Sequence, residues 1–474
     1  MKLNELTLTK TIKMLKSKQI SHSELYSAVT QKIDKVNNSL NVYVALDNEA
    51  VLKTKNTLDL PLAGVPIAVK DNFLTVGLPT TASSKVLSGF HSPYESTVTK
   101  KIRDSGGVII GKTNMDAWAH GSSTESSDFG PTKNPRNPEH LPGGSSGGSA
   151  AAIAANMAIG AIGSETAGSI RQPASWCGVV GMKPTYGRVS RAGVIAMASS
   201  TDSPGPIGKT VIDCAVLLNH IAGKDCYDAT TSSLAVSDYT AYLSKGVKGM
   251  KVGICYVDHP KVKGTPAALA VLDAGKVFER LGATVDLISA SDTLMANRIL
   301  NPNYAIGVYT VVQRAEVSSN LARYDGIRIG RGRDFLATEA KRRIILGTFT
   351  LSQSFVEKYY VRAQKVRSLI IQNFHNLFGT YDILIAPTSA GYAQRLGSSA
   401  DNPLFGEIED MLLEASSIAG LTGINVPCMR DPKTNLFLGL DIMADQWQEE
   451  KILQAAYAYE QATKWNEWVA NESE

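Results

Sequence analysis

The sequence predicts an α/β fold, in which helices cover a β-sheet. Helix-like and strand-like segments alternate along almost the whole chain, which is the pattern of layered α/β proteins. The 474 residues are 43% hydrophobic, which is enough for a large core. No proline- or serine-rich linker and no internal repeat divides the chain. We therefore expect a single domain over residues 1–474, beginning with a helical arm of about residues 1–58.

Each expected element has a local reason. In the arm, Ser21 and Glu24 form a capping-box pattern, and apolar residues follow it at helical spacing. Short apolar and β-branched runs predict strands at 42–46, 65–69, 108–110, 251–256, 284–288, 382–386 and 436–442. Apolar periodicity predicts helices at 267–281 and 451–462. The alanine-rich stretch 150–162 is predicted to be a buried helix that runs into a strand.

Composition and charge exclude several classes of protein. The net charge is +4 and the basic residues occur in short clusters, so nothing indicates direct nucleic-acid binding. The five cysteines are widely spaced without a CxxC pair, which is typical of neither a disulfide framework nor a zinc site. The N-terminus lacks an apolar targeting segment, and the longest apolar stretch is too short to span a membrane. We expect a cytoplasmic protein without bound metal, or one of an organellar matrix if the source is eukaryotic.

Two glycine- and serine-rich segments are the most unusual part of the sequence: 142–149 (PGGSSGGS) and 163–173 (GSETAGSIRQP). One interpretation is a phosphate-binding loop, but no Gly-Lys-Ser/Thr follows at the required spacing and no GxGxxG is present. A second interpretation is a flexible loop without chemistry. A third is a serine hydrolase site. The third is favoured because another glycine-rich turn follows at 177–185, and three such turns indicate close approaches of the backbone.

A nucleophilic serine needs a base. The chain has seven histidines, yet none lies in these segments, and there is no GxSxG elbow. His120 and His140 are the nearest, and an isolated histidine is more often structural. Lysine replaces histidine in some triads, provided that it is neutral. Lys70 ends an apolar run and would lie in a low-dielectric interior, although a surface lysine at a strand end is the alternative.

From about residue 5 to residue 465, the chain resembles the amidase signature family. The resemblance is carried by the Gly-Val-Pro strand that ends in Lys70, the Gly-Gly-Ser-Ser-Gly-Gly sequence that contains Ser145, and the Gly-Ser-Ile-Arg sequence that contains Ser169. It implies a large, mixed, twisted β-sheet covered by helices on both faces. It also implies a catalytic triad in which Ser169 is the nucleophile, Ser145 the bridging residue and Lys70 the base.

The chemistry of such a triad is amide hydrolysis. Neutral Lys70 takes a proton through Ser145, Ser169 attacks the amide carbon to form an acyl-enzyme, and ammonia leaves with a proton from the same relay. Water then releases the acid. The negative oxygen of each tetrahedral intermediate is expected to bind backbone N–H groups of the preceding turn, those of Thr166, Ala167 and Gly168. The family usually has glycine where this chain has Ala167, which restricts the backbone of the turn.

Within the family, three segments are most similar to the glutaminase subunits of glutamyl-tRNA(Gln) amidotransferases: 182–191, 318–326, and 341–348 with 364–367. That similarity implies glutamine as the substrate. Arg343 is then expected to bind its carboxylate and Asp410 its ammonium, with Tyr309 as a hydrogen-bonding wall. The segment 323–341 is shorter than in this group, and residues 203–204 differ from its pattern.

The same similarity implies partners. Ammonia from glutamine would pass to a tRNA-binding, kinase-like subunit, while a small third subunit would clamp both chains. The kinase-like subunit would amidate Glu attached to tRNA(Gln), or Asp attached to tRNA(Asn), and would hold the ATP and Mg²⁺. This chain is expected to bind no cofactor and to meet tRNA only through the partner. Two alternatives stay open: a stand-alone amidase for another small carboxamide, and a binding scaffold that has lost catalysis.

Overall fold

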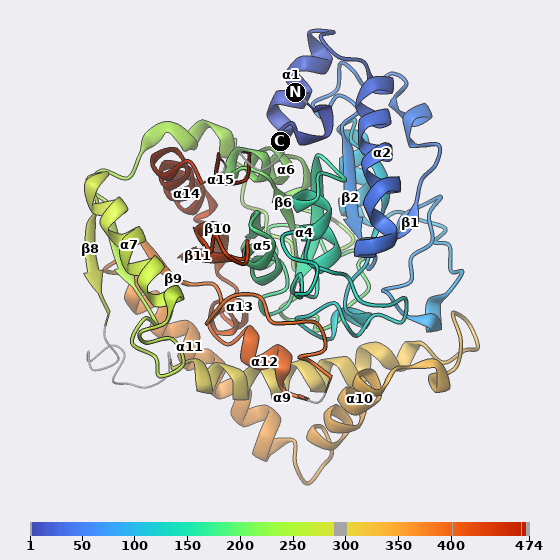
Figure 1. Cartoon of the computed structure of the whole chain (residues 1–474). Helices are drawn as coiled ribbons and strands as arrows, with labels where there is room; N and C mark the ends of the chain where they lie inside the picture. Colours follow the sequence, from blue (N-terminus) through green and yellow to red (C-terminus); the bar gives the residue numbers. More distant parts are fainter. Residues whose placement is uncertain (1, 289–300, 401, 466, 471–474) are drawn as a thin grey trace.

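Eleven strands form one mixed β-sheet through the middle of the molecule (Figure 1). The computed structural model describes residues 2–288, 301–400, 402–465 and 467–470. Across the sheet the order is β1 (Tyr43–Leu46), β3 (Val108–Thr113), β2 (Pro66–Lys70), β4 (Gly160–Glu165), β6 (Ser203–Gly208), β5 (Val180–Lys183), β10 (Thr422–Arg430), β11 (Phe437–Ala444), β9 (Ile383–Pro387), β7 (Lys251–Ile254) and β8 (Thr284–Leu287). Neighbours are parallel in β3–β2–β4 and in β9–β7–β8, and antiparallel elsewhere. The expected mixed sheet is confirmed.

The parallel pairing of β2 and β4 matters most for function. Val69 lies opposite Ile162, so the carboxyl ends of both strands meet at the same edge of the sheet. Lys70 is the last residue of β2, and Glu165 is the last residue of β4. Since the turn that contains Ser169 continues directly from β4, the topology brings this turn and Lys70 to one edge.

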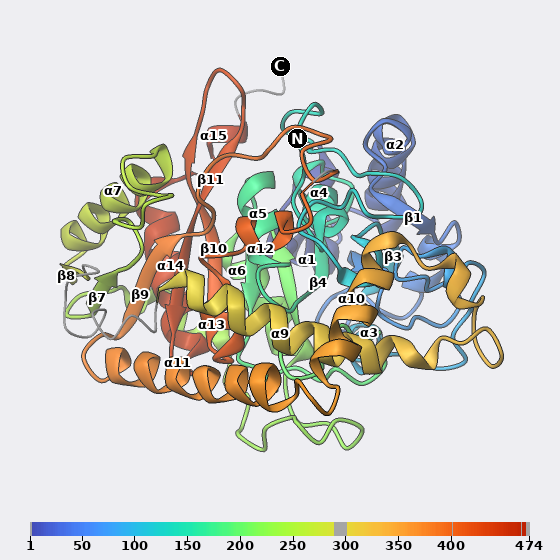
Figure 2. The same cartoon turned by 90° about the horizontal axis from the view of Figure 1, so that it is seen from below.

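Helices make up most of the remaining chain. In chain order they are α1 (Leu8–Lys16), α2 (His22–Leu40), α3 (Thr97–Asp104), α4 (Gly147–Ala154), α5 (Arg171–Cys177), α6 (Val211–Ile221), α7 (Pro266–Arg280), α9 (Pro302–Asn320), α10 (Thr338–Thr350), α11 (Arg362–Phe378), α12 (Phe405–Glu409), α13 (Glu414–Ile418), α14 (Glu449–Thr463) and α15 (Glu467–Ala470). Figure 2 shows α9, α10 and α11 as a layer on one side of the molecule, with α9 and α11 side by side. No helix in the described ranges is long and apolar enough to cross a membrane.

The helices cover both faces of the sheet, as expected. A Cβ added to Gly205 of β6 would lie 3.1 Å from Ile170, which begins α5. A Cβ added to Gly208 would lie 2.8 Å from Asp213 of α6. Residues three apart in a strand point to opposite faces. Helices α5 and α6 therefore pack on opposite sides of the same strand, with α4 beside α5 and with α3 and α14 beside α6.

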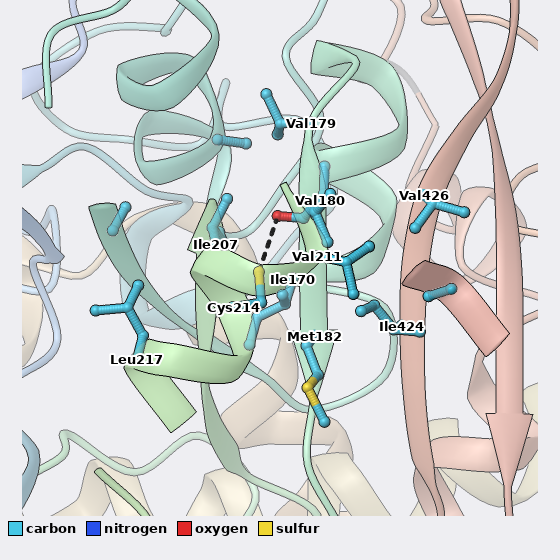
Figure 3. Close-up of a cluster of buried hydrophobic side chains, with 14 of the residues drawn as sticks. Ile170, Val179, Val180, Met182, Ile207, Val211, Cys214, Leu217, Ile424 and Val426 are labelled. Atoms are coloured by element: carbon cyan, nitrogen blue, oxygen red, sulfur yellow. Dashed lines mark hydrogen bonds between the residues drawn. The ribbon is translucent and has the colours of Figure 1, made fainter. Parts of the chain in front are cut away.

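Apolar side chains fill the space between α6 and the centre of the sheet (Figure 3). Cys214 of α6 lies among Val180, Met182 and Ile207, all of them buried. Its thiol donates to the Val180 carbonyl at 3.8 Å, and burial raises the pKa of Cys214 well above its usual range. Burying each large apolar side chain contributes roughly 1.5–3 kcal/mol. This core holds in register the strands that carry the candidate site.

Most of the elements predicted from the sequence are confirmed. The capping box at Ser21 and Glu24 is present, and the seven predicted strands occur with ends shifted by at most three residues. The stretch 150–162 is α4 running into β4, as predicted. The sequence did not predict β5, β6 and β10. β6 reads Ser-Pro-Gly-Pro-Ile-Gly, a composition that disfavours a strand, and it forms because it is buried between β4 and β5.

The N-terminal arm is joined to the sheet. Its strand β1 pairs with β3 at the sheet edge. From α2, His22 Nε2 donates to the Ala63 carbonyl at 2.8 Å and the Tyr26 hydroxyl donates to the Gly64 carbonyl at 3.0 Å. These bonds hold α2 against the residues that lead into β2, and so support the strand that ends in Lys70.

Gly64 provides a test of this contact. It has φ +77°, and an added Cβ would lie 2.4 Å from His22 Nε2, whereas Gly89 has φ +78° with nothing within 4 Å of an added Cβ. Gly89→Ala should lower the free energy of unfolding by about 1–2 kcal/mol, the cost of the left-handed backbone. Gly64→Ala should lose roughly 1–3 kcal/mol more through overlap with His22. Denaturant unfolding of both variants measures the difference, and equal losses would contradict the packing role of Gly64.

Candidate active site

Lys70 lies in the interior at the end of β2, with none of its side chain exposed. Its Nζ lies 2.8 Å from the Ser145 hydroxyl, 3.0 Å from the Ser164 carbonyl and 3.1 Å from the Ser164 hydroxyl. Asn72 also donates to the Ser164 hydroxyl, at 2.9 Å. A neutral amine has two N–H groups, which Ser164 can accept, and one lone pair, which can accept the proton of Ser145. The alternative of a surface lysine is wrong.

Burial determines the protonation of Lys70. It lowers the pKa of Lys70 to about 7, although the nearby carboxylates of Asp116, Asp202 and Glu165 partly oppose this. Burial also lowers the pKa of Lys183 to about 7, but the Lys183 amine contacts only the carbonyls of Pro184 and Leu421. What distinguishes Lys70 is therefore its contact with a serine hydroxyl in the glycine-rich loop.

Ser145 is fully buried in the loop that precedes α4, and its peptide bond to Gly144 is cis. The Gly144 N–H donates to Gln172 Oε1 at 3.0 Å, and the Ser146 N–H donates to the Ser169 carbonyl at 3.0 Å. These bonds tie the loop to the start of α5. The loop therefore runs beside the backbone of Ser169, while Ser145 itself contacts Lys70. Within the described ranges, no hydrogen bond joins the hydroxyls of Ser145 and Ser169.

A buried arginine fixes the turn that carries Ser169. Arg171, without exposed surface, forms ion pairs with Glu165 at 2.6 Å and with Asp441 at 2.9 Å. Burial opposes its charge, but Asp441 and Glu165 together raise the pKa of Arg171, which stays protonated. Glu165 also accepts the N–H groups of Ile170 and Arg171, both at 3.1 Å. Ser169 thus lies in a turn held at both ends by Glu165, and it is 4% exposed.

The turn from Thr166 to Gly168 presents free backbone donors. No acceptor for the N–H groups of these residues or of Ser169 is found in the part of the chain that the structure describes. The Thr166 hydroxyl donates to Asp202 at 2.8 Å, and the Ala167 carbonyl accepts from the Ser417 hydroxyl. Ala167 does not have a positive φ, so the turn accommodates alanine in place of glycine. Such donors are suited to a developing oxyanion.

Asp410 is placed against this turn. It follows α12 and is 4% exposed; Oδ2 accepts the Ser122 hydroxyl at 2.6 Å, and Oδ1 has no partner among the described residues. A Cβ added to Gly168 would lie 2.4 Å from Asp410 Oδ1. A buried carboxylate therefore lies against the residue that precedes the candidate nucleophile. Burial raises the pKa of Asp410 well above its usual range, so a cationic ligand would restore its charge.

Arg343 and Tyr309 belong to the same polar region. Arg343 of α10 is 4% exposed, its Nε donates to Glu339 at 2.6 Å, and its Nη1 has no partner in the described ranges. It lines a cavity of about 320 Å³. Tyr309 of α9 is buried, which raises its pKa well above the usual range, and the charges of Arg343 and Asp410 both act on it. The structure thus brings the three predicted substrate-binding residues together. Interpreting Arg343 as a surface residue, as its helix alone suggests, is wrong.

Several neighbours of the site were not singled out from the sequence. Ser164 and Asn72 orient the Lys70 amine, Glu165 and Asp441 hold Arg171, and Ser122 holds Asp410. A usable signal existed for one of them: Asp441 interrupts the otherwise apolar run 436–442, and an isolated acid in a buried strand needs a charged partner. Among the described residues, no three His, Cys, Asp or Glu side chains are grouped to hold a metal ion.

Comparison with known proteins identifies the family. The Amidase family model matches residues 24–453, and the chain belongs to this family of enzymes. It is 44% identical to the A-type subunit of the Halothermothrix orenii glutamyl-tRNA(Gln) amidotransferase over 98% of each chain. The crystal structure of the corresponding Thermotoga maritima protein has a TM-score of 0.81 at 36% identity, covering 97% of this chain and 95% of the other. The peptide amidase of Stenotrophomonas maltophilia has a TM-score of 0.77 at 28% identity, covering 95% of each.

The Arg171 ion pairs yield a prediction about stability. Arg171→Met leaves two carboxylates buried without a cation, which should cost about 3–5 kcal/mol. Arg395 and Glu139 form a 3.2 Å pair that is largely exposed, so Arg395→Met should cost less than about 1 kcal/mol. Thermal unfolding of both variants measures the contrast. A stable Arg171→Met protein would show that Glu165 and Asp441 do not depend on this arginine.

The lowered pKa of Lys70 predicts a pH profile. Since a lysine is neutral above its pKa, kcat/KM for amide hydrolysis should rise with pH through about 7 and then level off. Lys70→Arg should be inactive throughout, because guanidinium does not deprotonate. Lys183→Met is the matched control and should keep the profile. Turnover close to wild type in Lys70→Arg would make Lys70 a structural residue.

Proposed function

We propose that this chain is the glutamine-hydrolysing subunit of a tRNA-dependent amidotransferase. The observation that carries the proposal is the pairing of opposite charges around Ser169. The buried Asp410 carboxylate lies against Gly168, and the unpartnered Nη1 of buried Arg343 belongs to the same polar region. Glutamine carries an ammonium and a carboxylate beyond its amide, and burying both requires a partner for each. The relatives named as subunits of glutamyl-tRNA(Gln) amidotransferases support the same function.

In the proposed reaction, neutral Lys70 accepts the hydroxyl proton of Ser145, and Ser145 accepts the proton of Ser169 as that oxygen attacks the amide carbon. The N–H groups of the turn before Ser169 donate to the oxyanion. The proton then returns through Ser145 to the departing ammonia, which leaves Ser169 acylated. Water, activated by the same relay, releases glutamate and restores Ser169. Each step uses groups that lie at the shared edge of β2 and β4.

We further propose that the ammonia is delivered within a complex. A tRNA-binding, kinase-like subunit would use ATP and Mg²⁺ to activate Glu on tRNA(Gln), or Asp on tRNA(Asn), while a small third subunit would hold the two chains together. The net charge of +4 and the absence of a long basic block support contact with tRNA through the partner. Glutaminase rates with and without the co-purified partner subunits test this arrangement.

A stand-alone amidase is the second candidate. The polar region around Arg343 contains more acids than bases, since Glu407, Asp410 and Glu414 are buried there with Arg314 and Arg343. An excess of carboxyl groups fits an amide that carries an ammonium and no carboxylate. The match to a peptide amidase is compatible with such a substrate.

Substrate analogues separate the two candidates. For a glutaminase, Arg343→Ala should lower kcat/KM for glutamine at least tenfold and for 4-aminobutanamide, which lacks the carboxylate, less than twofold. Asp410→Asn should lower kcat/KM for glutamine and spare 4-carbamoylbutanoate, which lacks the ammonium. Steady-state kinetics on the three amides give the comparison. Equal losses on all three would assign both residues to the fold, and wild-type preference for 4-aminobutanamide would favour the stand-alone amidase.

A further inference from the structure

The cavity of about 320 Å³ beside Asp410 contains an additional polar side chain, His120. Its lining also includes Ser122, Arg343, Glu339 and Glu407. Ser122 connects the cavity to the candidate nucleophile, because its hydroxyl bonds to the Asp410 carboxylate that lies against Gly168. A ligand in this cavity would therefore be separated from the Ser169 turn by a single layer of side chains.

His120 is buried without an internal partner. It is 2% exposed, and neither Nδ1 nor Nε2 has a hydrogen-bond partner among the described residues. The two residues before it have left-handed backbones that non-glycine residues seldom adopt, with φ +61° at Trp118 and +64° at Ala119. Neighbours hold this strained segment: the Trp118 N–H donates to the Ala82 carbonyl at 2.9 Å, and its ring lies 4.6 Å from that of Tyr324. Strain that is held in place in this way is typical of functional sites.

The surrounding charges determine what His120 can bind. Burial, with the Arg343 and Arg314 guanidinium groups, lowers the pKa of His120 well below its usual range, so the imidazole is neutral and has one N–H to donate. The two acids that line the cavity are already paired, Glu339 with Arg343 and Glu407 with Arg314. Two unpartnered donors therefore line one cavity, the imidazole N–H and Arg343 Nη1, as far as the described residues show. A carboxylate, with two acceptor oxygens, matches such a pair.

We propose that His120 is a substrate-binding residue that, together with Arg343, holds the α-carboxylate of the substrate. One carboxylate oxygen accepts from Arg343 Nη1 and the other from the His120 imidazole. This inference rests on the proposed glutaminase function and deepens it, because it names a second residue that selects for an amino-acid carboxylate. Unlike Arg343, His120 contributes a hydrogen bond and no charge, so it adds selectivity without adding to the positive charge in the cavity.

The test compares His120→Phe, which keeps a ring without donors, with His120→Gln, which restores an N–H donor. His140→Phe is the matched control, since His140 is a buried histidine outside this cavity. His120→Phe should raise KM about tenfold for glutamine and for 4-carbamoylbutanoate, and change KM less than twofold for 4-aminobutanamide, which has no carboxylate. His120→Gln should recover part of the loss, and His140→Phe should leave the ratio of the three KM values unchanged.

Three results would overturn the proposal. Equal losses on the three amides would make His120 structural, unchanged KM values would leave only water in contact with its imidazole, and failure of His120→Gln to recover activity would exclude a donated hydrogen bond. Failure of the glutaminase proposal is distinguishable. In that case wild-type enzyme would hydrolyse neither amide that bears a carboxylate, whereas failure of the inference alone leaves wild-type glutamine hydrolysis intact.

Discussion

The burial of one lysine is the constraint around which the rest of the structure is arranged. Lys70 ends a strand that is flanked on both sides, and its amine is held by the carbonyl and hydroxyl of Ser164 and by the Ser145 hydroxyl. Because all three contacts are neutral, nothing in direct contact with the amine offsets the desolvation that lowers its pKa to about 7. A carboxylate in the place of Ser164 would keep the lysine charged and remove the base.

A second buried charge, on Arg171, anchors the nucleophile turn to the other half of the sheet. Glu165 ends β4 and Asp441 lies in β11, so this arginine joins two strands that are not neighbours. The proposed chemistry is thus built on sheet edges and buried ion pairs. The proposed substrate selection is built on a separate layer, the side chains of α9, α10 and α12. This division lets members of one family keep the same base and nucleophile while the ligand-facing helices differ.

The sequence was informative where a local pattern determines the outcome. Apolar runs predicted the outer strands, and the family motifs led to Lys70, Ser145 and Ser169. It was uninformative where burial overrides composition, as in β6 with its two prolines, and where a residue acts through a distant partner. His120 illustrates the second case: an isolated histidine is usually structural, and only the cavity, the unpartnered imidazole and the strained backbone before it suggest a ligand. Asp202, which accepts from Thr166, is another residue that only the fold brings to the site.

The central claim is that Ser169 is a nucleophile activated by neutral Lys70, and covalent trapping tests it most directly. The enzyme would be incubated with 6-diazo-5-oxonorleucine, a glutamine analogue that alkylates nucleophiles, and the modified peptide mapped by mass spectrometry. The account predicts a single adduct on Ser169 that forms faster as pH rises through about 7 and is absent in Lys70→Arg. An adduct on any other residue, or one that forms equally fast in Lys70→Arg, would contradict it.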